Sequence, residues 1–172
     1  DANAAVDLAT DQSYQMLPTL QETDFITPTS NNNITIPEGG TGAQTSIVIN
    51  DDLTIEGVQI KLSAVHGRDS DLAVELISPS GTRSMVLSPR SLLINDLDSS
   101  PNGITDFDNT VLLTNAFYGE SSKGDWKIIV TDTNSDWFSF NALRNRSWYK
   151  LSFRNNTSLG VLNQASIRIY GH

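Results

Sequence analysis

Along most of the chain, apolar residues alternate with polar ones at a period of two. The alternation is clear at Leu72, Val74 and Leu76, where Ala73 and Glu75 occupy the positions between. This pattern predicts half-buried β-strands, because successive side chains of a strand point to opposite faces of the sheet. Four further sets show the same period: Val58, Ile60 and Leu62; Trp126, Ile128 and Val130; Tyr149, Leu151 and Phe153; and Ile167 and Ile169.

Turn-forming residues separate these predicted strands. Clusters rich in Ser, Pro, Asn and Gly occur at 78–81, 99–103 and 121–125, and such residues favour tight turns because Pro sets φ and Gly permits positive φ. The phase of alternation changes at Gly57, between Ile55 and Val58, which predicts a β-bulge. Many short strands joined by turns predict an all-β fold, an antiparallel β-sandwich of the jelly-roll type.

Residues 1–30 differ from the rest of the chain, since they hold Ala, Asp, Thr and Gln with few large apolar side chains. We expect a linker or partly ordered N-terminal arm here, with one weak amphipathic helix as an option for Val6, Leu8 and Leu17. The sandwich is expected to occupy residues 31–172 as one domain.

Composition excludes several classes of function. The net charge of −9 argues against nucleic acid as a partner, because phosphates require a basic surface. No apolar run is long enough to span a bilayer, so no membrane segment is expected. The chain begins at Asp1 without a basic and apolar leader, which favours a mature fragment. The absence of cysteine excludes thiol catalysis, disulfides and cysteine-ligated zinc.

No catalytic site is expected. A hydrolase of the triad type needs a nucleophile, a base and an orienting group. The two histidines are His66 and the terminal His172, and no serine lies in a G-x-S-x-G motif. We interpret His66 as a partly buried side chain that ties down a loop. Acidic pairs two residues apart, such as Asp96 and Asp98, do not indicate a glycosidase, because nothing selects one pair as acid and nucleophile.

The acidic side chains instead suggest a calcium site. Calcium binds six to eight oxygen ligands, usually including carboxylates, and the chain offers little to softer metals. The candidate ligands are Asp69, Asp71, Asp106 and Asp108, which flank predicted strands. Solvated aspartates that cap turns are the alternative interpretation.

A reserve pair for the metal is Asp132 and Asp136, in the sequence D-x-N-x-D. This segment is not an EF-hand, because Trp137 stands where that loop requires Gly and Leu143 where it requires the bidentate Glu.

Five motifs follow one another along the chain. They are His66-Gly67-Arg68-Asp69-Ser70-Asp71-Leu72; Ser78-Pro79-Ser80-Gly81-Thr82-Arg83-Ser84; Ser100-Pro101-Asn102-Gly103-Ile104-Thr105-Asp106-Phe107; Phe117-Tyr118-Gly119-Glu120 followed by Gly124-Asp125-Trp126; and Gly160-Val161-Leu162 with Ile167-Arg168-Ile169-Tyr170-Gly171. In their order and spacing these motifs resemble the P domain of kexin- and furin-type subtilisin-like serine proteases. The resemblance runs from about Asn31 to Gly171.

The resemblance implies a non-catalytic accessory domain that lies against the subtilisin-like catalytic domain of the same polypeptide and supports its folding, stability and calcium response. It also implies secretion to the extracellular space, with a bacterial source favoured and protein substrate as a further partner. The competing interpretation is a carbohydrate- or protein-binding sandwich. Within the motifs, Trp126 is expected to anchor the core. Glu120 is expected to accept backbone N–H bonds or to pair with an arginine such as Arg83.

One region departs from the family pattern. Around 134–158 the chain has more residues than the family usually has, among them Trp137, Phe138, Phe140, Trp148 and Tyr149. We expect an inserted hairpin or long loop that packs on the sandwich as a small cluster. The alternative is an exposed aromatic patch that binds a partner. Coplanar exposed rings of Trp137 and Trp148 would favour ligand stacking, and buried rings would favour packing.

Overall fold

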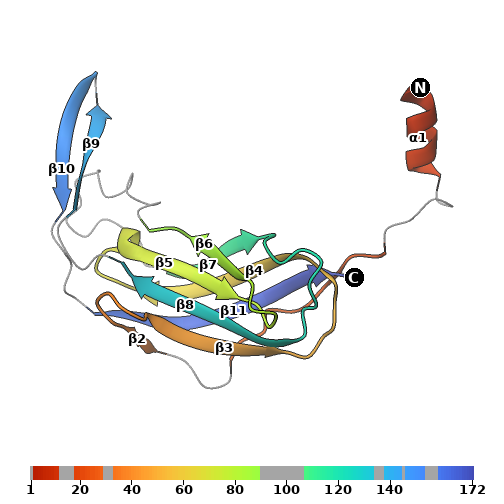
Figure 1. Cartoon of the computed structure of the whole chain (residues 1–172), viewed down its shortest axis with the longest axis horizontal. Coiled ribbons are helices and arrows are strands. Elements are labelled where there is room, and N and C mark those ends of the chain that lie inside the picture. Colours follow the sequence, from red (N-terminus) through yellow and green to blue (C-terminus); the bar gives the residue numbers. More distant parts are fainter. Residues whose placement is uncertain are drawn as a thin grey trace.

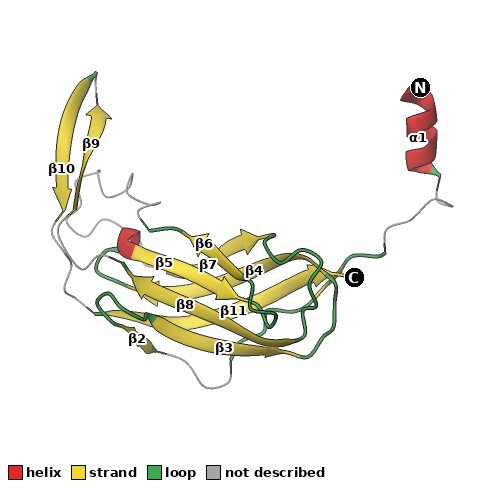
Figure 2. Ribbon diagram, in the orientation of Figure 1, coloured by secondary structure: helices red, strands yellow, loops and turns green. Residues whose placement is uncertain are grey.

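The computed structural model describes residues 2–11, 18–28, 33–89, 107–133, 138–144, 146–153 and 159–172. Strands form two layers, and the described helices are one at the N-terminus and one short turn of 3-10 helix (Figures 1 and 2). The helical elements are α1 (Ala2–Thr10) and η2 (Asp69–Asp71). The strands are β1 (Gln21–Glu22), β2 (Ile34–Ile36), β3 (Ala43–Ile49), β4 (Ile55–Val65), β5 (Leu72–Ile77), β6 (Arg83–Leu87), β7 (Phe107–Thr114), β8 (Gly124–Asp132), β9 (Phe138–Arg144), β10 (Ser147–Phe153) and β11 (Gly160–Gly171).

The two layers are antiparallel sheets. The first has the order β1-β11-β4-β7, with β2 also paired to β11, and the second has the order β3-β8-β5-β6. The strands β9 and β10 pair only with each other in the described part of the chain and form a separate hairpin. The predicted all-β antiparallel sandwich is therefore confirmed.

The core lies between the sheets and is built from the alternate positions that the sequence pattern indicated. Leu72, Val74 and Leu76 on β5 are each at most 1% exposed. At the centre, Trp126 on β8 is fully buried. Its indole N–H donates to the Ser122 carbonyl at 2.7 Å, and its ring meets Phe117 edge to face at a centroid distance of 5.0 Å. The predicted role of Trp126 as a core anchor is confirmed.

The predicted bulge is also present. Tyr170 pairs with Gly57 while the next residue, Gly171, pairs with Ile55, so Glu56 is an additional residue on β4. This extra residue changes which alternate positions face the core, because side chains on a strand point to opposite faces in turn.

Part of the N-terminal region pairs with the sandwich. The helix α1 includes Val6, which is 60% exposed, while Leu17 lies outside the described residues. The following segment returns to the sandwich, where β1 pairs with the end of β11 and Ile26 forms a bridge with Ile167. Part of the region predicted as an arm thus extends an edge of the first sheet.

The burial of Trp126 gives a stability prediction. Replacing it with alanine removes a fully buried aromatic ring and should lower the free energy of unfolding by roughly 3–5 kcal/mol. The measurement is a urea titration followed by circular dichroism. Trp148→Ala is the matched control, since its side chain is 71% exposed and should change the free energy of unfolding by less than about 0.5 kcal/mol. An unchanged midpoint for Trp126→Ala would contradict the described core.

Candidate functional site

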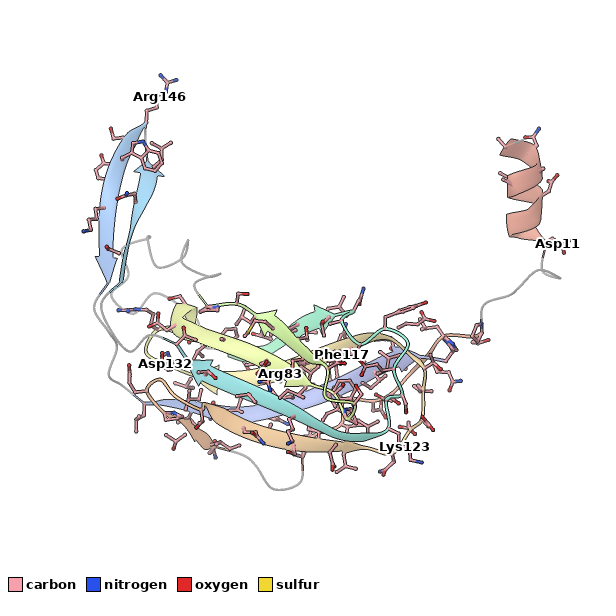
Figure 3. The ribbon with its side chains drawn as sticks, viewed as in Figure 1. Asp11, Arg83, Phe117, Lys123, Asp132 and Arg146 are labelled. Atoms are coloured by element: carbon pink, nitrogen blue, oxygen red, sulfur yellow. The ribbon has the colours of Figure 1, made fainter. Side chains whose placement is uncertain are left out.

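The chemistry-bearing side chains gather at one end of the sandwich, where β4 turns into β5 and where β8 ends. The 3-10 turn η2 holds Asp69 and Asp71, whose side chains are buried. Asp132 ends β8 directly opposite Leu72, the first residue of β5. We call this group, with His66 and Arg68, the polar end cluster. Figure 3 marks Asp132 at the end of the sandwich from which the hairpin rises.

His66 connects the strands of this cluster. Its Nε2 lies 3.2 Å from Asp132 Oδ2 and its Nδ1 lies 2.8 Å from the Arg68 carbonyl oxygen. When the ring is protonated, both nitrogens can donate to these acceptors. In the neutral ring, Nδ1 can instead accept the Arg68 backbone N–H, 3.1 Å away. These contacts agree with the predicted role of His66 in tying down a loop, and the side chain is buried where partial burial was expected.

The surroundings of His66 favour the charged ring. Burial lowers the pKa of His66. The hydrogen bonds to Asp132 and to the Arg68 carbonyl, together with the negative charges of Asp132 and Asp71, raise it, and the resulting pKa lies above the ordinary value of 6.5. Because both ring nitrogens are engaged by Arg68 and Asp132, neither is free to take a proton from a nucleophile, so these contacts do not provide a catalytic base.

Asp71 is held by its neighbours on both sides. Its Oδ2 lies 3.4 Å from Arg68 Nη1. Its backbone carbonyl accepts both the N–H and the hydroxyl of Thr133, at 2.9 and 2.8 Å. These bonds join the β4–β5 connection to the last residues of β8 and fix the geometry of the cluster.

Three of the four predicted calcium ligands lie within the described residues. Asp69 and Asp71 share the η2 turn, and their oxygens are the kind that calcium prefers. Asp108 lies on β7, next to Phe107, which pairs with Ala64 near the same end. It is exposed, however, and its Oδ1 accepts the Asn109 side-chain amide at 2.8 Å. Asp106 lies outside the described residues.

The reserve pair is likewise only partly described. Asp132 is buried in the polar end cluster and bonded to His66, whereas Asp136 lies outside the described residues. Within the described ranges, no three His, Cys, Asp or Glu side chains form a group that could hold a metal ion. The calcium site therefore stays a prediction, and Asp69 and Asp71 are the candidate ligands that share one described turn.

Glu120 has a different partner from the two predicted for it. Its Oε2 accepts the Ser80 hydroxyl at 2.7 Å. Burial raises the pKa of Glu120, but hydrogen bonds from Thr82, Ser80 and Ser78 lower it, and the net pKa lies below its ordinary value. The carboxylate thus joins the 78–82 turn to the connection before β8.

Arg83 does not pair with Glu120. Its guanidinium forms a two-pronged pair with Glu75, its neighbour across β5 and β6, with N–O distances of 2.8 and 2.6 Å. The prediction of a Glu120–Arg83 pair is therefore wrong. The β5–β6 register pairs Arg83 with Ile77 and Glu75 with Met85, which places Glu75 diagonally across from Arg83 and within reach of its guanidinium.

The aromatic region forms the β9–β10 hairpin, which projects from the sandwich beside the polar end cluster, with Arg146 at its tip (Figures 1 and 3). Trp148 is 71% exposed and Tyr149 is 53% exposed. The expectation that these two rings pack on the sandwich is wrong. Trp137 lies outside the described residues.

Pattern analysis missed the attachment of residues 21–26 to β11, which we call the strap. Thr23 and Ile169 exchange two hydrogen bonds of 3.0 Å, one of them through the Thr23 hydroxyl. The Phe25 ring lies between Lys61 Nζ and Arg168 Cζ, each 4.3 Å from its centroid. The strap has too few apolar residues to show a strand period, so its position could not be recognised in advance.

No helix within the described ranges has the length and apolar character that crossing a membrane requires.

Comparisons with known proteins agree on one family. A sequence model of the proprotein convertase P-domain matches residues 55–142. The chain is 35% identical over 180 residues to an extracellular serine protease of Aeromonas sobria, a match that covers 100% of this chain and 28% of that protein. It is 32% identical over 91 residues to human proprotein convertase subtilisin/kexin type 7, covering 53% of this chain and 11% of the human protein.

A solved structure supports the same relationship. The crystal structure of the Aeromonas sobria serine protease resembles this chain with a TM-score of 0.80 at 34% identity, over 100% of this chain and 30% of that one. The same protease in complex with a chaperone gives a TM-score of 0.81 at 35% identity. The chain thus spans less than a third of the length of this protease.

The raised pKa of His66 predicts how stability depends on pH. A group whose pKa is higher in the folded state stabilises the protein at pH values below its unfolded pKa, and this contribution disappears as pH rises through the folded pKa. The difference in the free energy of unfolding between the wild type and His66→Gln should therefore be largest below pH 6.5 and shrink above it. Urea titrations across this range measure the difference. A difference that grows with pH would contradict a raised pKa.

Proposed function

Because the chain belongs to the proprotein convertase P-domain family, we propose that it is the non-catalytic accessory domain of a secreted subtilisin-like serine endopeptidase. In this proposal the domain supports the folding and stability of the catalytic part of the same polypeptide. The observation that carries it is the family match over residues 55–142, which begins at β4 and ends within β9. The engaged ring nitrogens of His66 agree with a domain that does no chemistry itself.

The strap provides a physical route for this support. Backbone bonds hold Thr23 to Ile169 and Ile26 to Ile167, so the chain before residue 21 leaves the sandwich from a fixed point on β11. A neighbouring domain joined at a fixed point is present at high effective concentration, so even a modest contact between the two stabilises both.

The proposal also includes secretion of the parent protein and a role for this domain in recruiting protein substrate. The Aeromonas sobria relative is described as extracellular, and the exposed hairpin offers a surface for protein. Carbohydrate stacking has less support, because Trp148 and Tyr149 are successive residues of β10. Successive side chains on a strand point to opposite faces, so these two rings do not share one platform.

The stabilising role can be tested in the intact parent protein. Removal of residues 33–172 should abolish peptidase activity or greatly shorten its half-life. Phe25→Ala should give a milder loss, because it removes the ring that Lys61 and Arg168 contact, worth roughly 1–2 kcal/mol for two such contacts. The measurement is residual activity after heating.

Tyr118→Ala is the control for Phe25→Ala, since Tyr118 is 73% exposed and lies in the turn after β7. An intact protein without residues 33–172 that keeps its full activity and heat resistance would overturn the proposed function.

We also propose that calcium binds at the polar end cluster, with Asp69 and Asp71 among its ligands. A ligand that binds the folded state alone stabilises it by RT ln(1 + [L]/Kd), so calcium should raise the melting temperature and chelator should lower it. Asp69→Asn should reduce this response, whereas Asp108→Asn, at an exposed site with its own amide partner, should preserve it. A melting temperature that changes with neither calcium nor chelator would contradict the proposed calcium site.

A further inference from the structure

The strand β3 is an edge of the second sheet, and among the described strands it pairs with β8 alone. Its register with β8 runs from Ala43 to Ile49 without a shift. The strand contains no charged residue, no proline and no glycine. In Figure 1 it lies along the lower margin of the sandwich. A regular edge of this kind directs alternate backbone N–H and C=O groups away from the sheet, where another strand can pair with them.

The other described edge strands are interrupted or short. The strand β7 places two residues, Asp108 and Asn109, opposite Ser63 of β4, and Asn109 has a φ of 50°. The strand β6 carries Arg83 and has one extra residue, Val86, in its register with β5. Beyond β11 the first sheet ends in β1 and β2, of two and three residues. Bulges, charges and short strands all discourage edge pairing, so β3 is the one described edge without such protection.

The outward side chains of β3 are compatible with pairing to a second β3. Gln44, Ser46 and Val48 are exposed and alternate with buried residues. In an antiparallel pair of two β3 strands with a two-fold axis at Ser46, this residue faces Ser46 of the partner copy, and Gln44 faces Val48. All of these side chains are neutral, so no directly opposed pair joins like charges.

We propose that the domain forms a two-fold symmetric dimer in which the β3 strands of two copies pair antiparallel, with Ser46 on the axis. An edge without charges offers nothing to attract a charged segment, whereas it is complementary to a second copy of itself. Identical strands that meet in this way use up both β3 edges, so the assembly closes at two copies. The proposal goes beyond the accessory role and does not depend on it.

The charge of the chain sets the salt dependence of this dimer. Each copy carries a net charge of −9, and two copies therefore repel each other over a distance that salt shortens. Because the paired edges are uncharged, added salt should strengthen the dimer. A dimer held together by ion pairs would instead weaken as salt is added.

Sedimentation equilibrium of the chain at rising concentration tests the proposal. We expect a monomer–dimer equilibrium whose dissociation constant falls between about 50 and 500 mM sodium chloride. Ser46→Lys should raise the dissociation constant at least about fivefold, because two positive charges would face each other on the axis. Gln164→Lys is the matched control, since it adds the same charge at an exposed position of β11, and it should change the dissociation constant by less than about twofold.

A cysteine variant tests the register of the pair. The chain has no cysteine of its own, so Ser46→Cys introduces a single thiol. Directly opposed residues have Cβ atoms about 4.5–5.5 Å apart, close to the distance that a disulfide requires. Under mild oxidation Ser46→Cys should form a covalent dimer at least about tenfold faster than Val48→Cys, because the two copies of residue 48 would lie four residues, or roughly 14 Å, apart along the strands.

Each other result overturns the inference. A chain that stays monomeric at every concentration and salt would show that β3 does not pair in this way. Equal effects of Ser46→Lys and Gln164→Lys would move the contact away from β3, and a dimer weakened by salt would indicate ion pairing. Faster cross-linking through Val48→Cys would contradict an axis at Ser46. Slower hydrogen exchange of β3 amides in the intact parent protein, with the separate chain monomeric, would identify another part of that polypeptide as the partner.

Discussion

The burial of Trp126 on β8 is the interaction on which the rest of the domain depends. The strand β8 pairs with β3 on one side and β5 on the other, so its position sets that of both neighbours in the second sheet. The indole bonds to Ser122 and meets Phe117 edge to face, which ties the connection before β8 to the core. A buried aromatic ring of this kind combines large apolar area with a satisfied polar group, so it fixes the strand in both position and register.

The position of β8 in turn determines the polar end cluster. Register places Asp132 opposite Leu72, and Thr133 then bonds to the carbonyl of Asp71. His66 completes the connection between β4 and β8. Burying a carboxylate without partners costs free energy. In the cluster, Asp132 is bonded to His66 and Asp71 lies beside the Arg68 guanidinium. In Figure 1 the hairpin rises at this same end of the sandwich, with Trp148 and Tyr149 exposed.

The two attachments of the domain follow different physical rules. The strap is held by backbone bonds to β11 and by Phe25 between two cations, and it covers a sheet edge that would otherwise expose unpaired backbone groups. The hairpin is held by its own cross-strand bonds and presents side chains outward. One attachment thus fixes where the preceding chain leaves the domain, and the other offers a surface for contact.

Sequence alone determined the sandwich, the core set around Trp126 and the bulge at Gly57, because burial on one face of a strand imposes a period of two and an added residue breaks it. The motifs around His66, Pro79 and Trp126 were enough to identify the family. Tertiary structure decided which partners the polar groups find: Asp132 meets His66 across 66 residues, Arg83 meets Glu75 rather than Glu120, and Asp108 turns to Asn109. It also decided that Trp148 is exposed and that Phe25 lies between Lys61 and Arg168. Local patterns report which face of a strand is apolar, but long-range pairing depends on strand order and register, which no local pattern contains.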